Sequence, residues 1–152
     1  MRLLHRSSEN LVFQVSRRER DAWLSLASLY PRIPPGHLKL SRSAEVNASN
    51  QSLLEEALAE QRAENQRQLR KLLADSARWI HYENGWKLVL KESDTEWLLQ
   101  VLNEIRVGSW VRLGSPEQDI CALNEETAPH VWAMEISGAL QVALLQALES
   151  ER

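Results

Sequence analysis

The chain has 152 residues, of which 43% are hydrophobic and 26% charged, and it contains a single cysteine. This length predicts one domain, residues 1–152. A domain of this size can bury a sizeable core, so its fold is not expected to depend on disulfides or a structural metal. The net charge of −3 is uneven, because residues 1–42 carry seven Arg and one Lys against three acidic residues, a balance of +5, and the remainder carries −8.

The first thirty residues predict a β-hairpin followed by a helix. Residues 1–6 form the first strand, and every second side chain of the next strand is large and apolar: Leu11, Phe13 and Val15. This two-residue period is that of a strand with one buried face. Ser16 and Glu19 then form a capping box, which predicts a helix that ends at Pro31. One side of this helix is expected to pack inward: Ala22, Trp23, Leu26, Ala27 and Tyr30.

A loop and a long helix are predicted next. Residues 31–50 are rich in Pro, Ser and Asn and have no period, which favours a loop. The helix that follows begins near Asn50 and runs to about Ile80, but its middle, between Leu58 and Leu69, is almost wholly polar. Two interpretations stay open: a solvated surface helix, or an arm that projects from the body and pairs with a second copy as a homodimer.

A third strand and a central helix are predicted after a turn at residues 83–85. Residues 86–90 alternate in the manner of a strand, which would complete the N-terminal sheet. The segment from Lys91 to Gly114 predicts one long helix. Ser93 and Glu96 have the spacing of a capping box, so this helix is expected to begin near Asp94.

The central helix is predicted to be apolar around most of its circumference. One stripe at 100° per residue is expected to face the core: Leu98, Val101, Leu102, Ile105 and Leu113. A second stripe places Asn103 and Arg106 between Leu99 and Trp110, and only Gln100 and Glu104 define a wet face. A helix of this kind is normally enclosed by neighbours, which predicts that it forms the centre of the domain.

The C-terminal part predicts an acidic loop, residues 115–127, and a final helix, Ala128 to about Glu149, with Pro129 near its start. The expected fold class is therefore α+β and mostly helical. It has three or four helices and a small antiparallel sheet formed by an N-terminal hairpin and a central strand.

The sequence predicts a cytoplasmic protein without a membrane span. The lone Cys121 cannot form an internal disulfide, and the first residues lack the continuous apolar run of a secretory signal. The most apolar window, residues 129–148, carries His130 and Glu135, and a carboxylate at the bilayer centre costs about 3 kcal/mol. This window is interpreted as a buried helix.

No motif predicts a metal, a cofactor or a catalytic centre. The histidines are far apart in the sequence and no pair has helical spacing: His5, His37, His81 and His130. No glycine-rich phosphate loop follows a strand, and no serine elbow is present. An enzyme is consequently the least favoured class of function.

Asn103, Arg106 and Trp110 form the candidate binding face. Asn103 and Arg106 are three residues apart on one side of the central helix, and the guanidinium can lie over the indole one turn on. A planar fork of donors suits a carboxylate or main-chain carbonyls. Two interpretations stay open: these side chains tie down a loop, or they anchor a protein partner or a small acidic ligand.

Several segments that cover both ends of the chain form a pattern known from another family: the opening MRLLHR, the run LNEIR at residues 102–106, Leu113-Gly114, and VALLQAL in the last helix. In these segments the chain resembles the bacterial AosR family, which was long catalogued as a domain of unknown function. The resemblance implies a non-enzymatic cytoplasmic regulator of the oxidative-stress response that senses redox state through paired cysteines and works with a sigma factor. With Cys121 alone, an intramolecular disulfide switch does not carry over to this chain.

Three functional hypotheses follow. The first is a non-catalytic interaction or regulatory module that binds a protein partner through the Trp110 face or the arginine-rich N-terminal part. The second is a DNA-associated transcriptional regulator, and the third is an uncharacterised enzyme. The second would use basic side chains of the N-terminal part: Arg17, Arg18, Arg20, Arg32, Lys39 and Arg42.

Overall fold

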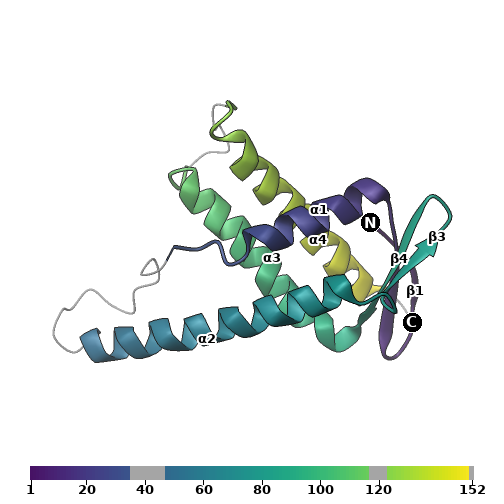
Figure 1. The fold of residues 1–152 in the computed structure, drawn as a ribbon, viewed down its shortest axis with the longest axis horizontal. Helices are drawn as coiled ribbons and strands as arrows, with labels where there is room; N and C mark the ends of the chain where they lie inside the picture. The colour runs from purple at the N-terminus through teal and green to yellow at the C-terminus, as the bar shows by residue number, and fades with distance from the viewer. Residues whose placement is uncertain (35–46, 117–122, 151–152) are drawn as a thin grey trace.

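The computed structural model describes residues 1–34, 47–116 and 123–150. Within these ranges the chain is α+β and mostly helical, as predicted, with α3 and α4 side by side, α1 across them and the sheet at one end (Figure 1). The elements, in chain order, are β1 (Arg2–Arg6), β2 (Asn10–Val15), α1 (Arg17–Leu29), α2 (Asn47–Ala74), β3 (Trp79–Tyr82), β4 (Gly85–Lys91), α3 (Glu92–Arg112) and α4 (Ala128–Glu149).

The sheet consists of two hairpins joined edge to edge in the order β1-β2-β4-β3, and every pair is antiparallel. The predicted alternation in β2 is confirmed, because Leu11 pairs with Leu90 and Phe13 with Leu88, and all four side chains are buried. Cross-strand apolar pairs of this kind stabilise a sheet that has one covered face. The helices pack against that face.

The predicted N-terminal helix is confirmed in its start, its end and its buried side. The Ser16 hydroxyl accepts a hydrogen bond from the Glu19 amide at 3.3 Å, and the Glu19 carboxylate accepts one from the Ser16 amide at 2.7 Å. Trp23, Leu26 and Tyr30 are buried. Tyr30 also anchors α1 to α2, because Asn65 donates to its hydroxyl oxygen at 3.1 Å.

The predicted end of the second helix is wrong. α2 ends at Ala74 rather than near Ile80, because Asp75 starts a turn in which its carboxylate accepts the Ala77 amide and its carbonyl accepts the amides of Arg78 and Trp79. The chain then enters β3, which the sequence did not predict. Pairing with β4 decides the strand, so the apolar residues at this point belong to the sheet and not to the helix.

The polar middle of α2 is held by polar contacts. Asn65, which is only 4% exposed, donates to Tyr30, and Arg62 forms an ion pair with Glu104 of α3 at 3.0 Å. The helix therefore packs through hydrogen bonds where apolar side chains are missing. Its N-terminal half extends away from the other helices in Figure 1, and Leu53 is 61% exposed.

The predicted start of the central helix is also wrong, because α3 begins at Glu92, directly after β4. Asp94, not Glu96, supplies the capping carboxylate, which accepts the Lys91 amide at 3.1 Å and forms an ion pair with Arg78. Arg78, from the turn before β3, thus fixes the strand-to-helix junction.

The core-facing stripe of α3 is confirmed for four of its predicted members, each at most 1% exposed: Leu98, Val101, Leu102 and Ile105. Leu113, the fifth, caps the helix and is half-buried. The predicted wet face is wrong in one position, since Glu104 is half-buried against α2, and Asn103 and Arg106 are exposed instead. The helix is thus enclosed on its core and α2 sides and open on the opposite side, where Gln100, Asn103 and Trp110 are exposed.

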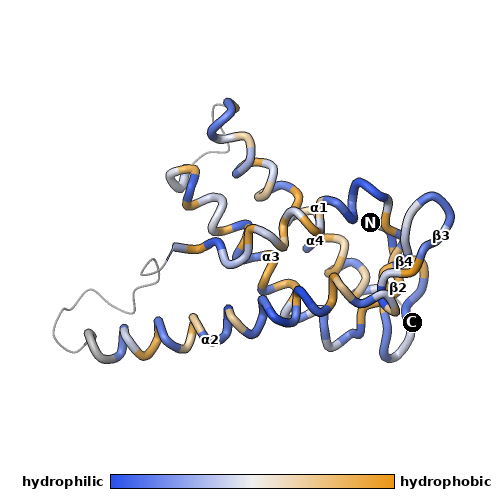
Figure 2. The backbone as a smooth tube through the Cα atoms, viewed as in Figure 1, coloured by the Kyte–Doolittle hydropathy of each residue, from blue (hydrophilic) through white to orange (hydrophobic). Residues whose placement is uncertain are grey.

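α4 has the bounds that the sequence predicted, and it packs beside α3. Its core-facing stripe is regular and small: Ala133, Ser137, Leu140, Leu144 and Ala147. Figure 2 shows that hydrophobic residues continue along the helix. Among the described helices, α4 is long and apolar enough to cross a membrane, although core helices pass the same test, and 28% of its most apolar window is buried. Much of its apolar surface is therefore not used by the core.

The two ends of the described chain meet at Arg6. This β1 side chain is 11% exposed, and its guanidinium donates to the carbonyl oxygens of Leu148 at 2.5 Å and Ser150 at 2.6 Å. It also pairs with Glu92, the first residue of α3, at 3.1 Å. A cation at the carbonyl end of a helix satisfies groups that lack partners within the helix. Arg6 therefore joins β1, α3 and α4.

Candidate functional site

The predicted face on α3 lies at the surface. Arg106 donates to Asn103 at 3.4 Å, and both side chains are exposed. The predicted stacking of Arg106 on Trp110 is not among the cation–π contacts of the described residues. Trp110 is 39% exposed, and its Nε1 donates to the carbonyl oxygen of Pro116 at 3.2 Å. Trp110 therefore restrains the chain after α3, whereas the bond between Asn103 and Arg106 joins these two side chains to each other.

The basic residues proposed for nucleic acid are placed in different surroundings. Arg17 and Arg18 are exposed in the first turn of α1, whereas the guanidinium of Arg20 lies 4.3 Å from the ring centre of Trp86. Arg32 is buried beyond the other end of α1, and the helix separates it from Arg17 by about 20 Å at a rise of 1.5 Å per residue. Lys39 and Arg42 lie outside the described residues, as does Cys121. The four described arginines thus do not form one continuous basic surface.

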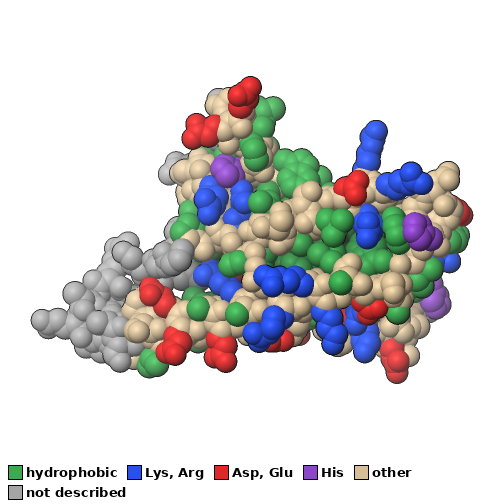
Figure 3. Space-filling model, in the orientation of Figure 1, with side chains coloured by type: hydrophobic (Ala, Val, Ile, Leu, Met, Phe, Trp, Pro, Cys, Tyr) green, Lys and Arg blue, Asp and Glu red, His purple; other side chains and the backbone are tan. Residues whose placement is uncertain are grey.

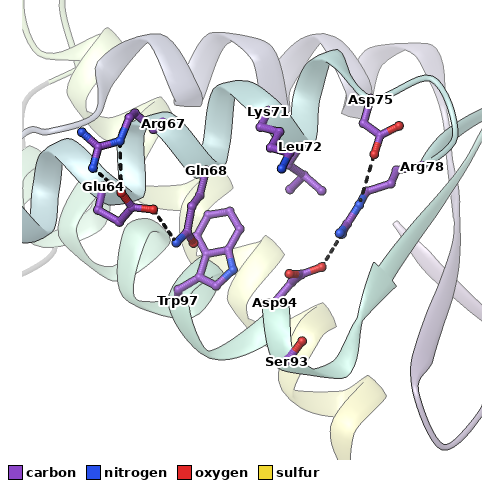
Figure 4. A pocket seen from close by; sticks show the side chains of 10 residues that line it. All are labelled: Glu64, Arg67, Gln68, Lys71, Leu72, Asp75, Arg78, Ser93, Asp94 and Trp97. Carbon is purple, nitrogen blue, oxygen red and sulfur yellow. Dashed lines mark hydrogen bonds and ion pairs between the residues drawn. The ribbon is translucent and has the colours of Figure 1, made fainter.

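A charged pocket of about 630 Å³ lies between α2 and the start of α3 (Figure 4). Five of its six charged side chains, all except Lys71, pair with one another. Glu64 accepts hydrogen bonds from Gln68 at 2.9 Å and from Arg67, and these bonds lower the pKa of the Glu64 carboxyl. Arg78 pairs with Asp94 and, at 3.5 Å, with Asp75.

These pairs make the pocket nearly neutral, because three basic and three acidic side chains line it, and Trp97 and Leu72 supply its apolar part. Paired charges of this kind are satisfied without a ligand. Within the described ranges, moreover, no group of three or more His, Cys, Asp or Glu side chains could hold a metal ion. The pocket therefore serves to join α2 to the β3–β4 hairpin and to α3.

A second hollow, of about 730 Å³, is an apolar groove between α1 and α4, here called the α1–α4 groove. One wall comes from α4 and is mostly apolar: Trp132, Ile136, Ala139, Leu140, Val142, Ala143 and Gln146. The other comes from α1 and is mostly polar: Arg18, Glu19, Asp21, Ala22 and Ser25. The α1–α4 groove therefore has one mostly polar wall, from α1, and one mostly apolar wall, from α4.

The α4 wall exposes more apolar surface than folding requires. Trp132 is 38% exposed and Val142 is 52% exposed, and both project from the helix on a side away from its buried stripe. Isolated exposed apolar residues are ordinary, but several in one groove indicate an interaction site. From its sequence, α4 is predicted only as a buried helix. The sequence does contain a signal for an exposed apolar side, because the apolar residues of α4 extend around most of its circumference. A helix at the surface of a domain needs only one apolar stripe, which faces the core.

No protein-family model matches the chain, and comparisons with curated proteins and with solved structures find no match either.

Proposed function

We propose that the protein is a non-catalytic interaction module that binds an amphipathic helix of another protein in the α1–α4 groove. The observation that carries the proposal is the exposed apolar wall of α4, centred on Trp132 and Val142. Trp132 is the natural anchor, because large aromatic side chains in a desolvated pocket contribute most of the binding energy at interfaces.

The two walls suggest the chemistry of the partner. From Trp132 to Gln146, α4 rises about 21 Å at 1.5 Å per residue, which suits a partner helix of about four turns. The apolar stripe of such a helix would lie on α4, and its polar side would face Arg18 and Asp21 of α1. Binding of a helix in a groove through apolar positions three and four residues apart is a common recognition mode.

The resemblance to the AosR family supports the same class of function, because it implies a cytoplasmic, non-enzymatic regulator with a protein partner, a sigma factor. The second hypothesis, a DNA-associated regulator, has less support. Arg20 packs on an indole ring and Arg32 is buried, so fewer arginines are exposed to the backbone of a nucleic acid. A salt titration separates the two, because DNA affinity falls steeply as salt rises and affinity for an apolar helix does not.

The test uses a matched pair of charge insertions on α4. Val142→Glu places a carboxylate in the groove, whereas Leu145→Glu places one at a site of similar exposure, 47%, that does not line the groove. A photo-crosslinker at Ala139 in the full chain captures the partner in cells, and mass spectrometry identifies the crosslinked segment. A synthetic peptide of that segment is then titrated against both variants by fluorescence polarisation.

Support requires that the peptide gains helical circular dichroism on binding, that Val142→Glu weakens binding at least tenfold, and that Leu145→Glu changes it less than threefold. Equal loss in both variants overturns the proposal. So does light scattering that shows a dimer which Val142→Glu alone dissociates, because the occupant of the groove would then be a second copy of this chain.

A further inference from the structure

The strongest unexplained feature is the buried guanidinium of Arg32. The residue is only 8% exposed, and its Nε is buried without a hydrogen-bond partner. Its Nη2 lies 2.5 Å from Nδ1 of His130, and no carboxylate pairs with it among the described residues. A buried charge without a counter-charge is expensive, so an arginine held in this state is a candidate binding group.

The position of Arg32 is set by the surrounding helices. Its main chain lies against α3 at Gly108, where an added Cβ would stand 2.7 Å from the carbonyl carbon of Arg32. Two residues earlier, the carbonyl oxygen of Tyr30 accepts a hydrogen bond from Gln66 of α2 at 3.2 Å, and the Tyr30 hydroxyl is bonded to Asn65. Arg32 is therefore preorganised, which lowers the entropy cost of binding a ligand.

Two further donors come from the parts of α3 and α4 next to Arg32. Arg112, in the last turn of α3, lies one helical turn after Gly108 and therefore on the side of α3 that contacts Arg32. Its charge lowers the pKa values of both Arg32 and His130, in each case after the larger effect of burial. His130 lies in the first turn of α4, and because its Nδ1 accepts from Arg32, its proton is on Nε2. In Figure 3 basic and histidine side chains gather near the adjoining ends of α3 and α4.

Among the described residues, the balance of charge at this point is positive. Glu126 is the acidic side chain that acts on His130 within the described residues, and it is exposed, so solvent screens it. The positive end of the α4 dipole adds to the two guanidinium groups. We propose that Arg32, Arg112 and His130 form a binding site for a small phosphate, either inorganic phosphate or a phosphomonoester.

A dianionic phosphate fits this group of donors best. Two guanidinium groups can satisfy the charge of close to −2 that a phosphomonoester carries at pH 7, and neutral His130 can donate from Nε2 to a third oxygen. A nucleic-acid backbone would need a row of exposed cations, and here the central one, Arg32, is buried. The site lies beside the C-terminal end of α3 and is built from residues that do not line the α1–α4 groove, so it stands independently of the proposed function.

The experiment titrates the full chain with inorganic phosphate at constant ionic strength, with sodium chloride as the balancing salt. The dissociation constant is measured by calorimetry, and the imidazole signals of His130 are followed by nuclear magnetic resonance. Arg112→Gln is the test variant, because Arg112 is exposed and its loss leaves the core intact. Arg70→Gln, an exposed position on α2 with the same change of charge, is the control.

The expected result is saturable binding of phosphate that shifts the His130 signals. Arg112→Gln weakens this binding at least tenfold and abolishes the shift, whereas Arg70→Gln stays within twofold of the unaltered protein. Glucose 6-phosphate and acetate are titrated in parallel. If glucose 6-phosphate binds as tightly as inorganic phosphate, the ligands of this site include phosphomonoesters. Equal weakening in both variants, absence of saturable binding, or tighter binding of acetate than of phosphate would each overturn the proposal.

Discussion

Replacement of Gly108 by alanine sets two effects of opposite sign against each other. In a helix interior, alanine is favoured over glycine by about 1 kcal/mol. At Gly108, however, the new methyl group would stand 2.7 Å from the carbonyl carbon, 2.9 Å from Cβ and 2.9 Å from the carbonyl oxygen of Arg32. Overpacking typically costs about 1 to 3 kcal/mol, and two of these three atoms are main chain, so the neighbour cannot simply rotate away. We expect the clash to prevail, with a net loss of about 1 kcal/mol.

Gly138→Ala in α4 is the matched control. The nearest atom to a methyl group there is Cδ of Arg106 at 3.8 Å, an ordinary contact, so this variant should be more stable by about 1 kcal/mol. Urea denaturation followed by tryptophan fluorescence measures both free energies of unfolding. If Gly108→Ala proves as stable as Gly138→Ala, the close approach of Arg32 to α3 is refuted.

Three further predictions concern the ends of the chain, the core and pH. Arg6→Gln removes the charged donor from the carbonyls of Leu148 and Ser150 and should lower the free energy of unfolding by about 2 kcal/mol in the same urea assay. An unchanged midpoint of urea unfolding would contradict the role of Arg6 in joining β1 to the end of α4. Leu98→Ala deletes a side chain that is 0% exposed and should cost about 3 kcal/mol, while Leu53→Ala, at 61% exposure, should cost less than about 0.5 kcal/mol; similar losses would contradict the assigned core. The pKa of His130 is lowered from 6.5, chiefly by burial and then by Arg32 and Arg112, so the unfolded chain takes up this proton at a higher pH than the folded protein does. Stability should therefore fall as pH decreases through 6.5 towards the lower folded pKa, and His130→Gln should reduce this dependence; an imidazole titration by nuclear magnetic resonance at or above pH 6.5 would contradict it.

Local patterns predicted most of the elements. The hairpin at the N-terminus follows from the alternation in β2, and the start of α1 follows from Ser16 and Glu19, which contact each other across three residues. The same kind of reasoning failed at β3, where apolar residues continue those of α2 and only the pairing with β4 makes them a strand. It failed at the start of α3 because Arg78, a residue distant in the chain, selects Asp94 as the capping carboxylate.

The candidate sites were harder to predict than the fold. Helical spacing predicts that Asn103, Arg106 and Trp110 lie on one face, and they do share a surface on α3. Charge alone groups Arg32 with the other arginines, although burial separates Arg32 from them. Helical spacing alone could not reveal that α1 covers only part of α4 and leaves Trp132 and Val142 beside an open groove.

The amino-acid sequence by itself determined the four helices, three of the four described strands and the α+β class, because periodicity, caps and turns are interactions between residues close in the chain. Only the tertiary structure decided which apolar side of α4 meets α3 and which stays exposed. It also decided that Arg32 contacts both His130 of α4 and Gly108 of α3, one turn before Arg112, although the three segments are far apart in the chain. The physical reason is that burial and the charge of neighbouring groups depend on how whole helices pack, and no short stretch of sequence contains that information.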